Sequence, residues 1–199
     1  MIELINATKR YGELTVLDAL NLKLPDEGVV ALLGPSGSGK TTLLRTIAGL
    51  EKLSAGEVIK PLGAQVSMVF QEDRLIPGLS ARENILAALP PGRESEAKAD
   101  RLLSACGIAH ASHLLPGELS GGMQRRVAIG RALAYGGDIL LLDEPFKGLD
   151  PETREDIIRI VQGSRTGGLT LLVTHSMEEA ERCADWVLRF EGPPLRLRG

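Results

Sequence analysis

Apolar and polar residues recur with two different periods along this chain of 199 residues. Unbroken apolar runs at residues 29–33 and 139–142 predict strands, and the run at 139–142 is typical of a parallel strand buried on both faces. Residues 169–173 predict another strand. Residues 16–24 alternate leucine with polar residues, which predicts a half-buried strand. Further strands are expected at residues 1–7, 57–60, 65–70 and 186–190, with a tight turn joining 57–60 to 65–70.

Between these strands, apolar residues recur at helical spacing. The predicted helices span residues 41–50, 94–106, 120–135, 151–162 and 176–183. The helix at 94–106 is amphipathic, and its expected inward-facing residues include Ala97, Arg101, Leu102 and Ala105. Strands that alternate with helices predict an α/β fold around a mostly parallel sheet. The Pro- and Arg-rich tail from residue 192 is expected to be frayed.

Composition narrows the class of protein. One domain accounts for the length, and a net charge of −3 argues against broad nucleic-acid binding, which needs clustered Lys and Arg. Cys106 and Cys183 lack the spacing of a metal site and are expected to be buried thiols of a reducing compartment. The N-terminus has no secretory signal pattern, and no apolar run approaches the ~18 residues that span a bilayer. We therefore expect a cytoplasmic protein.

A glycine-rich loop follows the strand at residues 29–33. Residues 34–41 match G-x-x-x-x-G-K-[ST], in which glycines let backbone N–H groups approach phosphate oxygens closely. The following helix directs its positive N-terminal end at the anion. Lys40 is expected to bridge the β- and γ-phosphates, and the Thr41 hydroxyl to ligate Mg²⁺. The alternative is a flexible Gly/Ser turn, which the flanking strand and helix disfavour.

Two adjacent carboxylates, Asp143 and Glu144, follow the apolar strand at 139–142. Ligands of α/β proteins gather at the carboxyl ends of the strands, so this pair is expected beside the glycine-rich loop. Asp143 suits the metal, and Glu144 suits a base that orients the attacking water. The structural alternative is a strand end that simply reaches solvent.

Three further polar sites are less specific on their own. Ser120-Gly121-Gly122 opens a helix with bare N–H groups, which makes either a second anion site or an ordinary Ser N-cap. His175 follows the strand at 169–173 and is either a γ-phosphate contact or an ordinary surface or core histidine. Gln71 follows the strand at 65–70, where a neutral amide can contact Mg²⁺ or water without adding charge.

Taken in their order along the chain, these segments resemble the ATP-binding subunit of an ABC transporter. The resemblance covers nearly the whole chain. Residues 34–41 resemble the Walker A loop, and Gln71 resembles the glutamine of the Q-loop. Residues 119–123 are similar to the signature sequence, and residues 140–143 to the Walker B strand. Glu144 then stands where the family has its catalytic glutamate.

Other positions follow from the same resemblance. His175 resembles the switch histidine, residues 148–150 the D-loop, and Tyr11 the aromatic residue that stacks on adenine, with an ordinary packed tyrosine as the alternative. The nucleotide-binding residues it implies are Tyr11, Gly34, Pro35, Ser36, Gly37, Ser38, Gly39, Lys40, Thr41, Thr42, Ser120, Gly121, Gly122 and Asp150. The implied catalytic residues are Gln71, Glu144 and His175, and the implied Mg²⁺ ligands are Thr41, Gln71 and Asp143.

The resemblance also implies a fold and an assembly. The fold is a P-loop NTPase with a mostly parallel core sheet, an antiparallel β subdomain and a small helical insertion at about residues 81–118 of a single domain, 1–199. Two subunits face head to tail, with ATP between the Walker A loop of one and the signature of the other. Transmembrane permease subunits hold this homodimer at the inner face of the cell membrane, with a separate solute-binding protein and no nucleic acid.

Two departures from the family pattern stand out. Met123 replaces the commonest glutamine, and Lys147 replaces the small residue usual before the D-loop glycine. The chain is also short for the family, without a C-terminal regulatory extension. Residues 70–77 and 79–84 are similar to importers of the nitrate, sulfonate and taurine type.

Three other functions compete with that of a transport ATPase. An ABC-type ATPase acting on nucleic acid or ribosomes usually carries two copies of the domain, a coiled-coil insertion or a zinc module. None of these features appears in this sequence, which disfavours that function. A P-loop kinase is disfavoured by the Ser120–Gly122 segment and His175. A nucleotide-binding regulator without turnover is disfavoured by Glu144.

Overall fold

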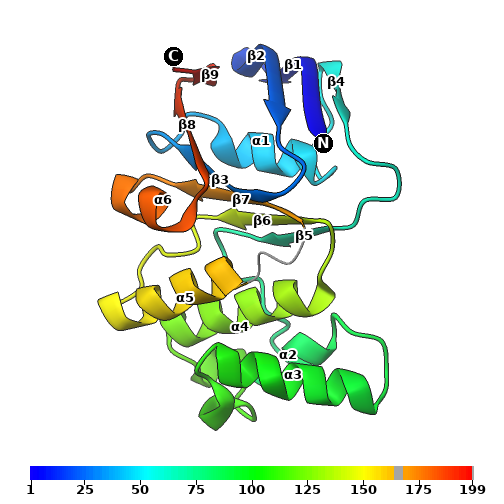
Figure 1. Ribbon diagram of the computed structural model, residues 1–199, viewed down its shortest axis with the longest axis vertical. Coiled ribbons are helices and arrows are strands. Elements are labelled where there is room, and N and C mark those ends of the chain that lie inside the picture. The colour runs from blue at the N-terminus through cyan, green and yellow to red at the C-terminus, as the bar shows by residue number, and fades with distance from the viewer. Residues whose placement is uncertain (164–167, 199) are drawn as a thin grey trace.

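The computed structural model describes residues 1–163 and 168–198, which form two β-sheets and the helices packed on them. Figure 1 shows the layers from top to bottom: a small antiparallel sheet, helix α1, the larger sheet, helices α4 and α5, and finally α2 and α3. Both termini lie near the small sheet (Figure 1). Of the helices in these ranges, none is both long and apolar enough to cross a bilayer.

The larger sheet has the order β5-β6-β7-β3-β8-β9 and is parallel except for β9. Its strands are β3 (Gly28–Leu33), β5 (Val66–Val69), β6 (Ile139–Asp143), β7 (Leu169–Thr174), β8 (Trp186–Glu191) and β9 (Arg196–Leu197). Every residue of β7 is buried, with alternate side chains in the cores above and below the sheet. The side chains of β6 likewise alternate between the two cores, so the apolar run at 139–142 is a strand covered on both faces, as predicted.

The smaller sheet is antiparallel, with the order β2-β1-β4. Its strands are β1 (Ile2–Tyr11), β2 (Leu14–Leu24) and β4 (Ala55–Ile59). The tight turn predicted between 57–60 and 65–70 is present, with the Ala64 amide donating to the Pro61 carbonyl at 3.1 Å. The strands on either side do not pair with each other, because β4 pairs with β1 while β5 pairs with β6 of the larger sheet. A short polar connection looks the same in sequence whether its flanking strands pair or enter different sheets.

Three apolar clusters hold the layers together. The first lies between the two sheets around α1 (Lys40–Ile47), and the second lies between the larger sheet and helices α4 (Gly121–Tyr135) and α5 (Pro151–Gly163). The third joins α4 to α2 (Ala81–Leu86), α3 (Arg93–Ala105) and the two 3₁₀ turns, Ala109–Ala111 and Pro116–Glu118. Helix α6 (Met177–Cys183) packs beside β3 and β7.

Two helix predictions needed correction. α1 ends at Ile47, before the predicted end at residue 50, because Gly49 adopts a φ of +77° and turns the chain away. α3 forms as expected but buries Ser95, Ala99 and Leu103, while Ala97, Arg101 and Ala105 are exposed. Small residues occur on both sides of α3, so the packed face depends on the position of α4.

Residues 192–198 of the C-terminal tail are ordered, contrary to the prediction, and residue 199 lies outside the described residues. Leu195 is 1% exposed, and its amide donates to the Val16 carbonyl at 2.8 Å. β9 then pairs with β8 as an edge strand. One leucine with a place in the core between the sheets is enough to fix a segment whose composition is that of a loop.

Candidate functional site

The glycine-rich loop connects β3 to α1 and takes conformations that require glycine. Gly37 and Gly39 have φ values of +79° and +110°, in the left-handed region that other residues rarely adopt. A Cβ on Gly39 would lie 2.7 Å from Val16 Cγ1 of the small sheet. No side chain caps the N-terminus of α1, so its first N–H groups are available to an anion.

The Lys40 side chain lies inside this loop. Its ammonium donates to the carbonyl oxygens of Gly34 at 2.8 Å and Pro35 at 2.7 Å, and to Ser38 Oγ at 3.2 Å. Lys40 is 4% exposed, and this burial lowers its pKa, against the opposing effects of the Glu144 and Asp143 carboxylates. A buried ammonium held by neutral carbonyls lacks a full counter-charge, which a phosphate would supply.

Asp143, the last residue of β6, lies against the first turn of α1. Its Oδ1 accepts a hydrogen bond from Thr41 Oγ1 at 3.1 Å, and the residue is 1% exposed. Burial raises the pKa of Asp143; the Thr41 hydrogen bond opposes this rise, and the charge of Glu144 adds to it. The structure thus joins two of the predicted metal ligands across 102 residues of sequence.

The oxygens of Asp143 and Thr41 fit a magnesium ion. Mg²⁺ prefers hard oxygen ligands and binds through one or two protein groups plus phosphate oxygens and water. Within residues 1–163 and 168–198, no group of three or more His, Cys, Asp or Glu could hold a metal alone. The donor set therefore suits a cation that arrives with a nucleotide rather than one held permanently by protein.

Glu144 has an unusual backbone conformation beside this pair. Its φ is +50°, and its amide donates to the Val173 carbonyl at 3.0 Å, which fixes the residue at the end of β6. Lys147 Nζ lies 3.1 Å from Glu144 Oε2, within ion-pair distance, although the direction of approach makes no hydrogen bond. A non-glycine residue held at positive φ is typical of a functional position.

Four predicted site segments follow four neighbouring strands. The sheet order β5-β6-β7-β3 places Gln71, Glu144, His175 and Gly34 after the carboxyl ends of adjacent strands. Gln71 and His175 have exposed side chains. Gln71 also lines a hollow with Arg45 and Lys147. One edge of the sheet therefore gathers residues distant in sequence.

The Ser120–Gly122 segment lies in a different layer from the loop. It begins α4 below the larger sheet, whereas α1 lies above it (Figure 1). Ser120 Oγ accepts from the Met123 amide at 3.3 Å, so it caps its own helix, and Ser120 and Gly121 are exposed. A Cβ on Gly122 would be 3.7 Å from Leu149, so α4 begins beside the residues predicted as the D-loop.

Two predicted nucleotide-binding residues have local partners of their own. Asp150 accepts from the Thr153 amide at 2.9 Å and from its hydroxyl at 2.7 Å, and these bonds lower the pKa of Asp150 while capping α5. Tyr11 ends β1 with its ring 4.7 Å from Lys9 Nζ and is 43% exposed. Its exposed ring remains available for stacking.

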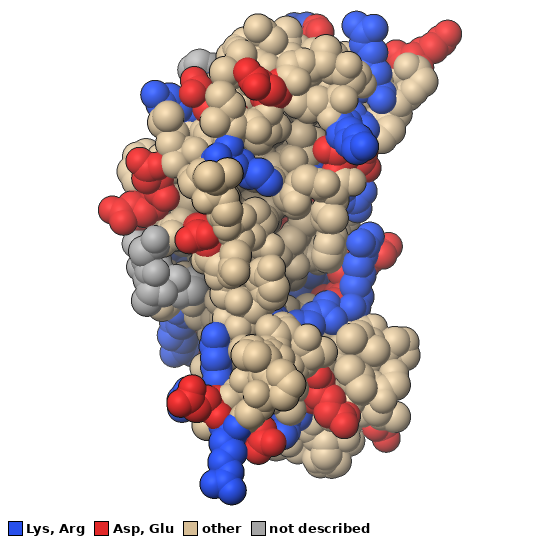
Figure 2. Space-filling view, turned by 90° about the vertical axis from the view of Figure 1, so that its right-hand side faces the viewer, with Lys and Arg blue, Asp and Glu red and all other residues tan. Residues whose placement is uncertain are grey.

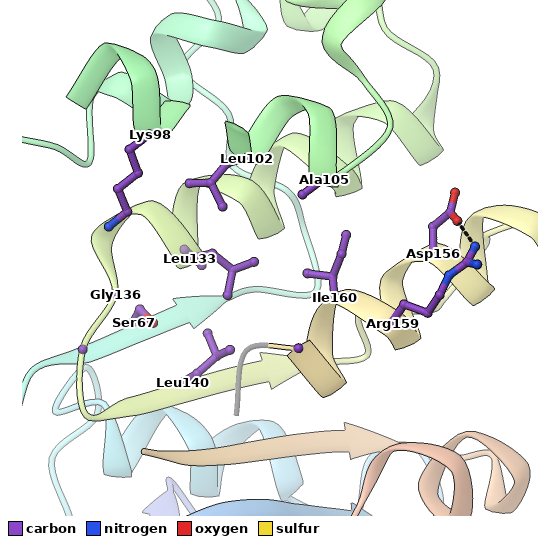
Figure 3. Close-up of a pocket in the computed structure, with 13 residues that line it drawn as sticks. Ser67, Lys98, Leu102, Ala105, Leu133, Gly136, Leu140, Asp156, Arg159 and Ile160 are labelled. Carbon is purple, nitrogen blue, oxygen red and sulfur yellow. Dashed lines mark hydrogen bonds and ion pairs between the residues drawn. The ribbon is translucent and has the colours of Figure 1, made fainter. Parts of the chain in front are cut away.

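A sizeable cavity lies elsewhere. It measures about 930 Å³ and is bordered by α3, α4, α5, β5 and β6. Figure 3 shows Leu102, Leu133, Leu140 and Ile160 around it, with the Asp156–Arg159 ion pair at one side. None of its lining residues belongs to the predicted site. Its wall is rich in leucine, isoleucine and alanine, so the site is placed at the glycine-rich loop and the strand ends, where the predicted residues lie.

Two residues of the site region were not predicted. Arg125 of α4 is 6% exposed and donates to the carbonyl oxygens of Phe70 and Gln71. The Lys147 ammonium pairs with Glu144. The sequence marked Lys147 only as a departure from the family pattern, and a basic residue on a helix, such as Arg125, is usually solvated, so no local signal predicted either contact.

Comparison with known proteins assigns this arrangement to a family. The ABC transporter family profile matches residues 17–147, which extend from β2 to the turn after Glu144. The chain therefore belongs to the ABC transporter ATP-binding family and is an ATPase.

Two curated relatives cover nearly all of the chain. The glutamine transport ATP-binding protein GlnQ of Escherichia coli is 39% identical over 203 residues, covering 92% of this chain and 85% of the relative. The aliphatic sulfonates import ATP-binding protein SsuB 2 of Pseudomonas syringae is 41% identical over 189 residues, covering 94% and 68%.

Solved structures share the fold. The ATP-binding cassette MJ0796, a dimer in a post-hydrolysis state bound to ADP and Pi, superposes with a TM-score of 0.87 at 32% identity, covering 95% of this chain and 94% of that one. A second dimeric structure of this cassette gives a TM-score of 0.86. The predicted α/β P-loop fold with a mostly parallel sheet and an antiparallel β sheet is confirmed.

Proposed function

We propose that this chain is the ATP-binding subunit of an importer and energises uptake of a small solute through separate permease subunits. The convergence of the glycine-rich loop, Gln71, Glu144 and His175 at one sheet edge carries the proposal. GlnQ and SsuB 2, named for glutamine transport and aliphatic sulfonate import, support the transport role. Residues 1–199 act as one domain in this proposal, with residues 81–118 as its helical insertion.

The residues of the site have separate roles. The loop amides and Lys40 bind the β- and γ-phosphates, with Tyr11 stacking on adenine. Thr41, Gln71 and Asp143 hold Mg²⁺, which when bound supplies positive charge to the phosphate oxygens. Glu144 orients and deprotonates the attacking water, and His175 contacts the γ-phosphate.

The dimer completes the site. Ser120, Gly121 and Gly122 of one subunit cover the nucleotide held by the other, and Asp150 lies at the contact between subunits. The exposure of this helix end in a layer apart from α1 supports the arrangement. The subunits then bind permeases at the inner face of the cell membrane, where residues 71–84 are the proposed docking segment. A separate solute-binding protein delivers the solute.

Lys40→Ala tests nucleotide binding directly. Loss of a charged hydrogen-bond partner is expected to weaken Mg-ATP binding about 10- to 100-fold, measured by calorimetry. Lys60→Ala is the matched control, because Lys60 Nζ also donates to a carbonyl of α1, that of Ile47 at 2.7 Å, but at the opposite end of the helix. Equal affinity in both variants would contradict the proposed phosphate site.

The transport role needs its own measurement. Coexpression with permeases encoded nearby is expected to yield a membrane complex whose solute uptake stops with Glu144→Gln. An active ATPase that copurifies with ribosomes or nucleic acid instead would overturn the importer role and leave the ATPase in place.

A further inference from the structure

A buried arginine fastens α4 to the chain after β5. Arg125 donates through Nη1 to the Phe70 carbonyl at 2.6 Å and through Nη2 to the Gln71 carbonyl. Its Nε lies 3.1 Å from Asp73 Oδ1. The guanidinium thus contacts three residues of the loop after β5, although Gln71 is 54 residues from Arg125 in the sequence. Burial raises the pKa of Asp73, and the charges of Arg125 and Arg131 oppose this rise.

A second arginine of α4 extends the attachment. Arg131 Nη2 donates to the Asp73 carbonyl at 3.0 Å, and its Nη1 donates to Asn84 Oδ1 at 3.4 Å. Asn84 is 0% exposed; its amide nitrogen donates to the carbonyls of Ile76, Leu79 and Ser80. Residues 70–84 are therefore bonded to α4 through a continuous set of side chains.

These bonds are costly to break. A buried guanidinium that loses its acceptors leaves charge and donors unsatisfied, and hydrogen bonds to charged groups are the stronger kind. Arg125 is five residues after Ser120 in one unbroken helix, a rise of about 7.5 Å at ~1.5 Å per residue. A displacement of the Ser120 end of α4 therefore moves the carbonyl of Gln71 with it.

We propose that Arg125 is a positioning residue that makes the signature end of α4 and the Q-loop move as one unit. The proposal rests on the proposed function, in which Ser120 covers the partner's nucleotide while Gln71 serves the site of its own chain. Closure of α4 on the partner's ATP then places Gln71 in the subunit's own site. Arg125 links the two nucleotide sites of the dimer without touching either nucleotide.

The experiment compares Arg125→Lys with Arg126→Lys in the full chain. Lysine keeps the charge of Arg125, but its single ammonium lacks the planar fork with which Nη1, Nη2 and Nε of Arg125 contact Phe70, Gln71 and Asp73 separately. Arg126 is the matched control, because its Nη1 reaches the Cys106 and Gly107 carbonyls, away from the Q-loop. Hydrogen exchange of residues 70–84, ATP affinity, and kcat and KM for ATP are measured for each.

Arg125→Lys is expected to speed exchange in 70–84 and lower kcat about tenfold, with KM and ATP affinity within about twofold of the parent. Arg126→Lys is expected to leave all four unchanged. Should Arg125→Lys fail to fold by circular dichroism, Asp73→Asn, which removes only the ion pair, is expected to show the same pattern more weakly. Unchanged exchange or unchanged kcat in the folded variant overturns the proposal. A parent without ATPase activity overturns the proposed function instead, and the exchange measurement still tests the attachment.

Discussion

The N-termini of α1 and α4 are both glycine-flanked helix ends that could bind an anion, yet their surroundings differ. At α1, Lys40 and Ser38 are buried within a loop of left-handed glycines, and Asp143 contacts Thr41. At α4, the end is exposed and Ser120 caps its own helix. The N-terminus of α1 therefore has a lysine ammonium, two oxygen atoms suited to a metal ion and a surrounding glycine-rich loop, all supplied by one chain.

Under the proposed function, this difference indicates which helix end needs a second subunit. Bare N–H groups alone bind anions weakly in water, because solvent competes for them. Enclosure by a partner removes that solvent and strengthens each contact. In the proposed dimer, the α4 end gains its binding energy when the subunits associate, whereas the α1 end can bind a nucleotide before association. The following predictions test this comparison.

Glu144→Gln has the largest expected effect. Removing the general base while keeping side-chain shape is expected to slow turnover about 10²- to 10⁴-fold, and ATP affinity should stay within about twofold. An ATP-bound dimer should accumulate, measured by gel filtration with light scattering. Glu94→Gln is the control, because Glu94 is an exposed residue of α3. Turnover at the parental rate in Glu144→Gln would remove this carboxylate from the mechanism.

Ser120→Arg separates the two helix ends. A long cation at the α4 end should block closure on the partner's nucleotide and lower hydrolysis about 10- to 100-fold, while the α1 end still binds ATP. Steady-state ATPase and calorimetry measure the two quantities. Ser104→Arg controls for the added charge, because Ser104 is an exposed serine of α3. If ATP binding is lost together with hydrolysis, the two ends are not independent.

Asp143→Asn sharpens the account of the α1 end. In the parent, Mg²⁺ is expected to raise the affinity for ATP, and we call the factor of this increase the metal-dependent gain. In Asp143→Asn this gain should fall about tenfold, because the amide is a weaker Mg²⁺ ligand, and the ATP affinity measured in EDTA should be unchanged. Burial raises the pKa of Asp143, so in the parent the gain should also shrink as the pH falls through this raised pKa and the carboxylate takes up a proton. If Mg²⁺ raised the ATP affinity of the parent and of Asp143→Asn by the same factor at every pH, Asp143 would be excluded as a Mg²⁺ ligand.

Lys147→Ser has the smallest expected effect. The ion pair between the half-exposed Lys147 and Glu144 competes with water for the carboxylate, and such pairs contribute about 0.5–1 kcal/mol. Its loss is expected to raise the turnover of the isolated subunit about two- to fivefold. Lys147→Arg, which keeps the charge, should remain near the parent, and reduced turnover in Lys147→Ser would assign the ammonium a supporting role.

Several parts of the fold could be predicted because their signal is local. The apolar runs that became β3 and β6 need burial, and the glycine-rich loop between β3 and α1 needs its glycines for φ values above zero. Other parts depended on distant partners. The face that α3 buries is set by α4, and the ordered tail depends on a core position for Leu195.

The sequence by itself determined the chemistry: which residues can bind a triphosphate, hold a metal or activate water, and which strands they follow. Those properties belong to side chains and to backbone conformations that only glycine adopts readily. Tertiary structure alone decided which of these groups meet. Thr41 reached Asp143, Lys147 reached Glu144, and Arg125 reached the Q-loop, because such contacts follow from how strands and helices pack rather than from any local pattern.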